Sequence, residues 1–208
     1  MTSTGRERLA GRAVDLAPRL LGWLLTSSSP DGAVTVALTE LEAYEGVDDP
    51  ASHGFRGPTR RNAVMFGPAG HLYCYFSYGL HWCANVVCGP PGVCSALLLR
   101  AGAVVEGADL AASRRPSARQ PRDLARGPAR LTSALGIGGE ADGRDLLDPA
   151  GCLRLRPGPP RGAVRQGPRV GISTAEDRPW RFWVDGDDTV STYRRGARRR
   201  PAAGTRPT

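Results

Sequence analysis

Lysine is absent from this 208-residue sequence, and all 28 of its basic residues are arginine. Arginine stays protonated in proteins and does not supply an amine nucleophile. The sequence therefore excludes enzymes that form an imine through a lysine side chain. With 20 acidic residues the net charge is +8, which favours a phosphate-rich partner over a membrane surface.

Cysteine is scarce, and its spacing matches no structural zinc site. The five cysteines lie at positions 74, 83, 88, 94 and 152, and no two of them form a C-x2-C pair. An odd count without a signal peptide is typical of the reducing cytoplasm, where we expect the protein to act. The longest apolar stretch near the N-terminus, LLGWLLTSS, is too short to cross a bilayer, so no membrane partner is predicted.

Signature motifs of several enzyme classes are also missing. The sequence has no P-loop, no nucleophile elbow, no dinucleotide-binding fingerprint and no zinc-deaminase signature. The spacings of His53, His71 and His81 match no metal motif. We therefore predict that the protein uses neither a metal nor a cofactor.

Glycine and proline are abundant, with 27 and 18 residues, and favour short strands joined by turns over a helical bundle. Helices are predicted at residues 15–27, 106–115 and 127–137. Strands are predicted at residues 33–44, 71–78, 82–88, 94–102, 151–156, 168–173 and 180–186. One domain at 15–193 is expected between a loose N-terminal segment, 1–14, and a disordered arginine-rich tail, 194–208.

The stretch ELEAYEGVDDPASHGFRG, residues 40–57, begins in a predicted strand and continues into a long loop. Alternation places Val34, Glu40, Glu42 and Tyr44 on one face, so an apolar face ends in carboxylates and opens into a cleft. A single glutamate is most often a surface residue. The tyrosine two residues after Glu42 favours a general base or nucleophile, whereas nothing distinguishes Glu40.

Three tyrosines follow in HLYCYFSYGLHW, where alternation separates Tyr73 and Tyr75 from Phe76 and Tyr78. Phe76 is expected in the core. Tyr78 precedes a glycine at the predicted hairpin tip, where an aromatic side chain can enter a base stack as a wedge. A tyrosine that faces a cleft can stack on a base.

Two arginine-containing stretches, GPTRRN and ARGPARL, are candidates for phosphate binding. They contain Thr59, Arg61 and Arg130, and the second stretch opens a predicted helix whose backbone amides also favour anions. Taken singly, each arginine is most often part of a solvated basic surface.

In their order and spacing these stretches resemble the 3-methyladenine (alkyladenine) DNA glycosylase family, which includes the mammalian enzyme. The resemblance covers residues 16–191 and is strongest in ELEAYEGVDDPASHGFRG, TRRNAVMFGPAGHLYCYFSYGLHWCANVV and ARGPARLTSALGI. It implies one α+β domain in which a curved antiparallel sheet carries a protruding β-hairpin and is surrounded by helices. It also implies a monomeric hydrolase that flips alkylated or deaminated purines out of double-stranded DNA and starts base excision repair at the nucleoid.

The resemblance assigns roles to seven residues of the expected pocket. Glu42 matches the glutamate that activates the attacking water, and Arg100 and the backbone carbonyl of Val170 match groups that help place that water. The side chains that match those enclosing the flipped base are Tyr44, His53 and Tyr75. Asn85 matches the asparagine on the pocket floor that tests for an exocyclic amino group.

The resemblance also assigns DNA contacts. Tyr78 matches the tyrosine inserted where the nucleotide was, and Thr59, Arg61 and Arg130 match positions that contact the DNA. Arg130 stands where the mammalian enzyme has lysine, which keeps the charge and changes its geometry.

Three alternatives remain at this stage. The chain can be a non-catalytic lesion-binding DNA module of the same fold, a metal-dependent hydrolase using Glu42 and the histidines, or a structural RNA-binding protein. Among glycosylase substrates, 3-methyladenine, 7-methylguanine, hypoxanthine and ethenoadenine all fit such a pocket, and the sequence does not rank them.

The absence of lysine predicts a monofunctional enzyme that leaves an intact abasic site. Strand-nicking glycosylases form an imine with the sugar, and this chain offers only its N-terminal amine for that reaction. Borohydride treatment during turnover should therefore trap no covalent protein–DNA adduct. A trapped adduct, or a strand break at the lesion, would contradict this prediction.

Overall fold

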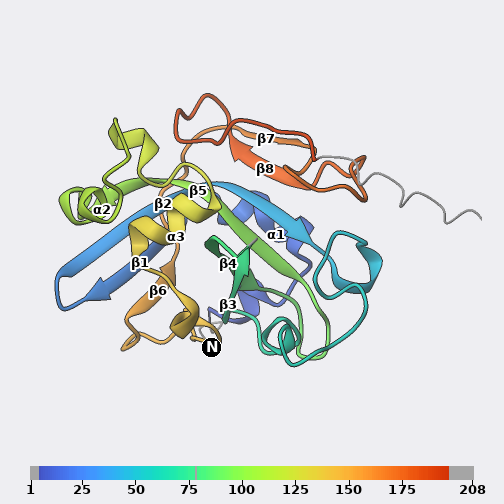
Figure 1. The fold of residues 1–208 in the computed structure, drawn as a ribbon. Helices are drawn as coiled ribbons and strands as arrows, with labels where there is room; N and C mark the ends of the chain where they lie inside the picture. The colour runs from blue at the N-terminus through green and yellow to red at the C-terminus, as the bar shows by residue number, and fades with distance from the viewer. Residues whose placement is uncertain (1–4, 78, 197–208) are drawn as a thin grey trace, which may run out of the picture.

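An eight-stranded antiparallel sheet runs through the residues that the structure, a computed structural model, describes, namely 5–77 and 79–196 (Figure 1). Its strand order is β3-β4-β5-β2-β1-β6, and a β7–β8 hairpin joins it through β8, which pairs with β2. The strands are β1 (Leu24–Ser29), β2 (Gly32–Tyr44), β3 (Leu72–Ser77), β4 (His81–Val87), β5 (Ala96–Glu106), β6 (Leu153–Arg156), β7 (Val164–Gly167) and β8 (Arg181–Val184).

Strand β2 is the centre of the sheet because three other strands pair with it. Its first half pairs with β1, its whole length from Thr35 pairs with β5, and β8 takes the place of β1 at residues 40–42. From Val34 to Ala43 every residue of β2 is buried. Its polar residues in this stretch are therefore enclosed by protein and need partners there.

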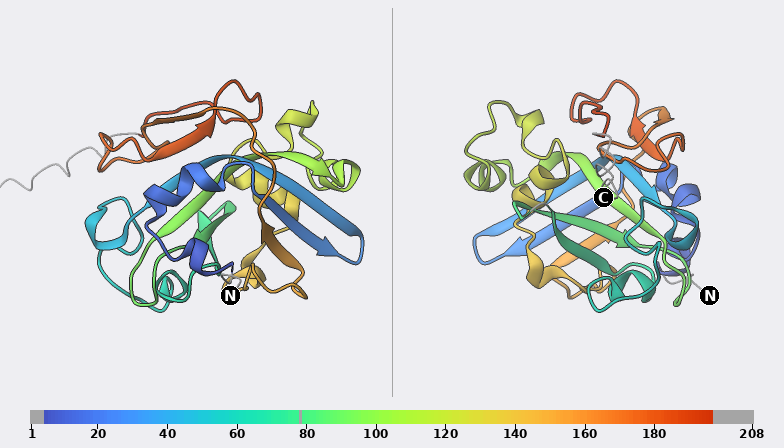
Figure 2. Two further views of the ribbon diagram at one scale, coloured as in Figure 1. Left: turned by 180° about the vertical axis from the view of Figure 1, so that it is seen from behind. Right: turned by 45° about the vertical axis from the view of Figure 1, so that its right-hand side comes forward.

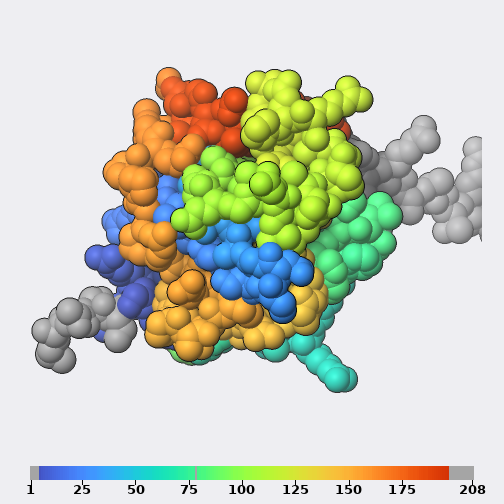
Figure 3. Space-filling view, turned by 90° about the vertical axis from the view of Figure 1, so that its left-hand side faces the viewer, coloured from blue at the N-terminus to red at the C-terminus, as the bar shows by residue number. Residues whose placement is uncertain are grey.

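Three helices pack around the sheet in the described part of the chain (Figure 2). Helix α1 (Ala13–Leu20) lies against β2, and α3 (Pro128–Leu135) packs on β4 and β5. The short helix α2 (Ala108–Arg114) lies beside the β1–β2 hairpin on one face of the molecule (Figure 3). These contacts bury one continuous apolar core, to which Cys74 and Cys88 contribute as small apolar side chains.

The predicted α+β class with a curved antiparallel sheet is confirmed, including the meander β3-β4-β5. The helix predicted at 15–27 is wrong beyond Leu20. The chain turns at Gly22, whose φ is +85°, and then enters β1, where pairing with both β2 and β6 outweighs the helical pattern of the leucines. No helix among the described residues is long and apolar enough to span a bilayer.

Two further local predictions are wrong. The strand predicted at 168–173 is a loop, and the strand of this region is β7, which ends at Gly167. Phe76 is not in the core but is 45% exposed and packs against Trp82 of the neighbouring strand, with ring centroids 5.0 Å apart. At the end of a two-stranded hairpin no second layer covers the side chain.

The N-terminal segment from residue 5 onward lies against the domain, although the sequence suggests that residues 1–14 are loose. Leu9 is fully buried in the core, and Arg6 forms an ion pair with Asp145 at 2.6 Å. Together with the hydrogen bond from the Gly89 N–H to the Leu9 carbonyl, these contacts hold a segment whose composition is otherwise polar. Most of the arginine-rich tail, from residue 197 onward, lies outside the described residues.

Strand β2 supplies a stability prediction. Leu38 has no exposed surface, so Leu38→Ala should lower the free energy of unfolding by about 2–5 kcal/mol in urea titrations. Val105→Ala, at a side chain that is 47% exposed, is the control and should change it by less than about 0.5 kcal/mol. Equal effects of the two substitutions would contradict a core centred on β2.

Candidate active site

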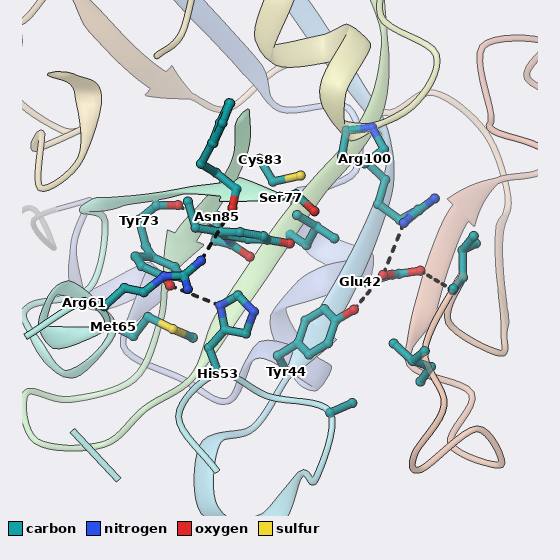
Figure 4. Close-up of a pocket in the computed structure, with 18 residues that line it drawn as sticks. Glu42, Tyr44, His53, Arg61, Met65, Tyr73, Ser77, Cys83, Asn85 and Arg100 are labelled. Carbon is teal, nitrogen blue, oxygen red and sulfur yellow. Dashed lines mark hydrogen bonds and ion pairs between the residues drawn. The ribbon is translucent and has the colours of Figure 1, made fainter. Parts of the chain in front are cut away.

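A cavity of about 450 Å³ lies where the ends of β2 and β5 meet the β3–β4 hairpin and the loop after β2 (Figure 4). This volume is within the range of small-molecule sites. Strands β2, β3, β4 and β5, the loop after β2, the start of α3 and the loop after β7 supply its walls, including Glu42 and Tyr44 from β2, Arg100 from β5 and Asn85 from β4. The predicted cleft at the carboxylate-bearing end of β2 is therefore present.

Glu42 lies on the cavity wall and has no exposed surface. Its Oε1 accepts a hydrogen bond of 2.6 Å from the backbone N–H of Val170, and its Oε2 accepts one of 2.9 Å from the Tyr44 hydroxyl. A guanidinium nitrogen of Arg100 lies 3.4 Å from the same Oε2 (Figure 4). The carboxylate is therefore held in one orientation by three separate groups.

The Tyr44 ring stands beside this carboxylate and is backed by a buried cation. The guanidinium of Arg169 lies 4.5 Å from the ring centroid, within the range of cation–π contacts. Arg169 is itself paired with Asp49 at 2.5 and 2.8 Å and donates to the Ala43 carbonyl at 2.9 Å. The pKa of Tyr44 is raised well above its ordinary value by burial and by the charge of Glu42, so the phenol stays protonated and donates to the carboxylate.

A second group of side chains forms the opposite side of the cavity (Figure 4). The His53 ring packs edge-on against Tyr75 with centroids 4.5 Å apart, and its Nδ1 is 3.0 Å from the Tyr73 hydroxyl. Loss of solvent and the nearby charge of Arg61 lower the pKa of His53, so the imidazole is neutral at neutral pH. Burial raises the pKa of Tyr75, so this phenol is neutral as well.

Asn85 lies in the same cavity and is 4% exposed. Its Nδ2 donates to the Tyr73 carbonyl at 3.2 Å. With this orientation of the amide, the Oδ1 is the atom that remains to accept a hydrogen bond from another molecule. A small apolar cluster that includes Met65, Tyr73 and Ala96 packs against Tyr75 in this part of the cavity.

The loop that carries His53 is fixed by Asn62, which sequence reasoning did not select. The Asn62 Nδ2 donates to the carbonyls of His53 and Gly57, and its Oδ1 accepts from Thr59. Gly54 approaches Cys94 so closely that a Cβ there would lie 2.2 Å from the Cys94 sulfur. Loop residues 53–62 are thereby held against the sheet without regular secondary structure.

Eight of the eleven predicted site residues line this one cavity: Glu42, Tyr44, His53, Arg61, Tyr75, Asn85, Arg100 and Val170. Thr59 and Arg130 do not line the cavity and lie exposed, on the loop and on the first turn of α3 respectively. Tyr78 lies outside the described residues. At Val170 the structure shows a hydrogen bond from the backbone N–H to Glu42. The family resemblance instead implied that the backbone carbonyl of Val170 helps to place the water.

Sequence reasoning missed two charged groups next to the cavity. Glu40, dismissed because nothing distinguished it, is fully buried and paired with Arg100 at 2.8 Å and with Arg181 at 2.7 Å. The pair of Arg169 and Asp49 has no exposed side-chain surface. The available signal for Glu40 was its place on the same strand face as the apolar Val34, since a carboxylate on a core-facing strand face requires cationic partners.

Comparison with known proteins places the chain among the DNA glycosylases, hydrolases that cleave N-glycosyl bonds in DNA repair. The chain belongs to the methylpurine-DNA glycosylase family, whose sequence model matches residues 7–188.

Similar proteins of three bacteria each carry the name "Putative 3-methyladenine DNA glycosylase". Those of Streptomyces avermitilis, Nocardia farcinica and Frankia casuarinae are 51%, 52% and 53% identical to the chain over 96%, 91% and 85% of its length. The alignments cover 95%, 91% and 86% of those proteins.

The buried pair behind Tyr44 supplies a second stability prediction. Asp49→Asn leaves the Arg169 charge buried without its partner, so the free energy of unfolding should fall by about 3–5 kcal/mol. The control is Asp185→Asn at the exposed pair with Arg165, which should cost less than about 1 kcal/mol. Urea titration of both variants checks this, and equal effects would contradict the role of burial.

Proposed function

We propose that the protein takes alkylated purine nucleotides out of duplex DNA, encloses the base in this cavity and hydrolyses its bond to the sugar. One observation carries the proposal: the fully buried carboxylate of Glu42 lies on the wall of a cavity that tyrosines line on two sides. A base inside a duplex hides its glycosidic bond, so extrusion has to precede hydrolysis.

The chemistry of the cavity walls fits a cationic purine. Alkylation at N3 or N7 gives the ring a positive charge, and the base is proposed to stack between the phenol rings of Tyr44 and Tyr75. Because the pKa of His53 is lowered by loss of solvent and by Arg61, the imidazole adds no positive charge at the edge of the base. His53 thus adds no repulsion of a cation, and of the two arginines that line the cavity, Arg61 and Arg100, the second is paired with Glu40 and Glu42.

Hydrolysis is assigned to Glu42, with Arg100 and Val170 holding it. The C1′–N bond breaks and its electron pair passes to the purine ring, which neutralises the positive charge of the alkylated base. Positive charge develops at the sugar, where the carboxylate stabilises it. A water molecule bonds to C1′ and gives its proton to Glu42, and the free base leaves.

Asn85 is proposed to read the base edge. Because its Nδ2 donates to the Tyr73 carbonyl, its Oδ1 is the atom that meets the base. This oxygen accepts a hydrogen bond from an exocyclic amino group and is repelled by a carbonyl oxygen. This arrangement supports adenine-derived bases that keep the exocyclic amino group, such as 3-methyladenine, over bases that carry an oxygen at the corresponding position.

The remaining predicted residues are assigned to the DNA. Thr59, Arg61 and Arg130 are proposed to contact phosphates, for which the exposed positions of all three side chains leave room. Tyr78 is proposed to fill the place that the extruded nucleotide leaves. The net charge of +8 suits this partner.

Replacement of Glu42, the proposed general base, tests its assigned role in hydrolysis. Glu42→Gln keeps the shape of the side chain and its acceptor oxygen but removes the charge, so it should retain binding to lesion-containing duplex. Single-turnover release of 3-methyladenine should fall by about 10²–10⁴-fold.

The matched control is Glu45→Gln, another buried glutamate, which accepts bonds from the Val14 amide and the Ser95 hydroxyl and does not line the cavity. This variant should release the base at the wild-type rate. Full activity of Glu42→Gln would overturn the role given to Glu42.

A further inference from the structure

Glu40 is a fully buried carboxylate with four polar contacts, and the proposed reaction gives it no role. Its Oε1 accepts hydrogen bonds from Arg100 Nε at 2.8 Å, from Arg181 Nε at 2.7 Å and from the Ser191 hydroxyl at 2.9 Å. Its Oε2 accepts a bond of 2.7 Å from the Ser191 backbone N–H. Residues from β2, β5, β8 and the segment after β8 thus meet at one carboxylate.

Arg100 connects this carboxylate to the cavity. Its Nε is bound to Glu40, and another nitrogen of the same planar guanidinium lies 3.4 Å from the Glu42 carboxylate. Because the guanidinium is rigid, fixing one edge on Glu40 fixes the direction of the opposite edge. The orientation of Arg100 toward Glu42 therefore depends on Glu40.

The strand pairing places Arg100 between the two glutamates. The register between β2 and β5 shifts twice around Glu40, so that Glu40 is opposite Ala101 and Leu41 is opposite Leu99. Arg100 is thereby left without an opposite residue in β2. Irregularities of this kind redirect side chains and are common beside active sites.

The charges of this cluster cancel only when Glu40 is included. Glu40 and Glu42 contribute two negative charges, and Arg100 and Arg181 contribute two positive charges. Without Glu40 the cluster would carry one net positive charge next to a sugar at which positive charge develops in the reaction. In a buried site this field acts with little screening by solvent.

We propose that Glu40 is a positioning residue for base release: it fixes Arg100 against Glu42 and cancels the charge of Arg181, so that the negative charge of Glu42 remains available to the sugar. This inference rests on the role proposed for Glu42. It extends that role to a charge-balanced cluster of Glu40, Glu42, Arg100 and Arg181, referred to below as the four-charge cluster.

Glu40 is ionised in this environment. Burial by itself raises the pKa of the carboxyl group, but Arg100 and Arg181 outweigh burial, and the pKa of Glu40 is lowered overall. The carboxylate is therefore present as a charge over the pH range in which a glycosylase works.

The first test is Glu40→Gln, which keeps the size of the side chain and removes its charge. Single-turnover base release should fall by about 10²-fold, the scale of a small misplacement of catalytic groups. Binding to a duplex that contains a lesion should not change, because Glu40 does not line the cavity. A rate and a binding constant that both stay at wild-type values would overturn the inference.

The second test separates charge balance from a merely structural role. Glu40→Gln combined with Arg181→Gln restores the balance of charges, although it also removes the bond of Arg181 to the Ser191 carbonyl and its contact with the Trp183 ring. Charge balance predicts that the double variant releases the base faster than Glu40→Gln alone. A purely structural role predicts that it is slower, and that result would overturn the inference.

The control for loss of a buried charge is again Glu45→Gln, whose buried carboxylate accepts bonds from the Val14 amide and the Ser95 hydroxyl and does not line the cavity. It should lower the melting temperature without changing the rate of base release. If Glu40→Gln does not fold, Ser191→Ala carries the test, because it removes one bond to Glu40 and one contact of Arg100. Reduced release by this variant supports the inference, and wild-type release overturns it.

Failure of this inference is distinguishable from failure of the proposed function. If Glu42→Gln is inactive and Glu40→Gln is fully active, only the role proposed for Glu40 is removed. Full activity of both variants removes the role of Glu42 as well, whereas wild-type protein that releases no base removes the proposed reaction itself.

Discussion

The arrangement of the site depends on one shared cation, the guanidinium of Arg100, which lies between two carboxylates that have no exposed surface. Burying two carboxylates on one strand is unfavourable unless cations and hydrogen-bond donors meet them. The curled sheet meets this demand by bringing β5 to one side of β2 and β8 to the other. The irregular register around Glu40 is part of the same solution, because it places Arg100 where both carboxylates reach it.

A second buried ion pair couples the loop after β2 to the aromatic wall. Asp49 belongs to that loop, and its partner Arg169 lies against the Tyr44 ring and directly precedes Val170, whose amide binds Glu42. The loop, the stacking ring and the carboxylate are thereby fixed relative to one another. A glycosylase benefits from such rigidity, since a water molecule and a sugar carbon have to meet in a defined geometry.

Much of this arrangement was predictable from the sequence, because local pattern carries it. Alternation identified β2 with Glu42 and Tyr44 on one face, and the family resemblance, not the tyrosine spacing, placed Tyr75 at the cavity. What sequence reasoning missed depends on pairing between distant segments. The strand after Gly22 was mistaken for helix because the strands that pair with it lie elsewhere in the chain. Glu40 was dismissed because its partners Arg181 and Ser191 are 141 and 151 residues away in the sequence.

The central claim is that an extruded alkylated purine loses its bond to the sugar in the cavity beside Glu42. Incubation of the wild-type protein with methylated duplex DNA, followed by chromatography of the small molecules released, tests it most directly. The account predicts free methylated purines, 3-methyladenine among them, and DNA strands that remain unbroken until alkali cleaves the abasic sites. Protein that binds the methylated DNA and releases no free base would contradict it.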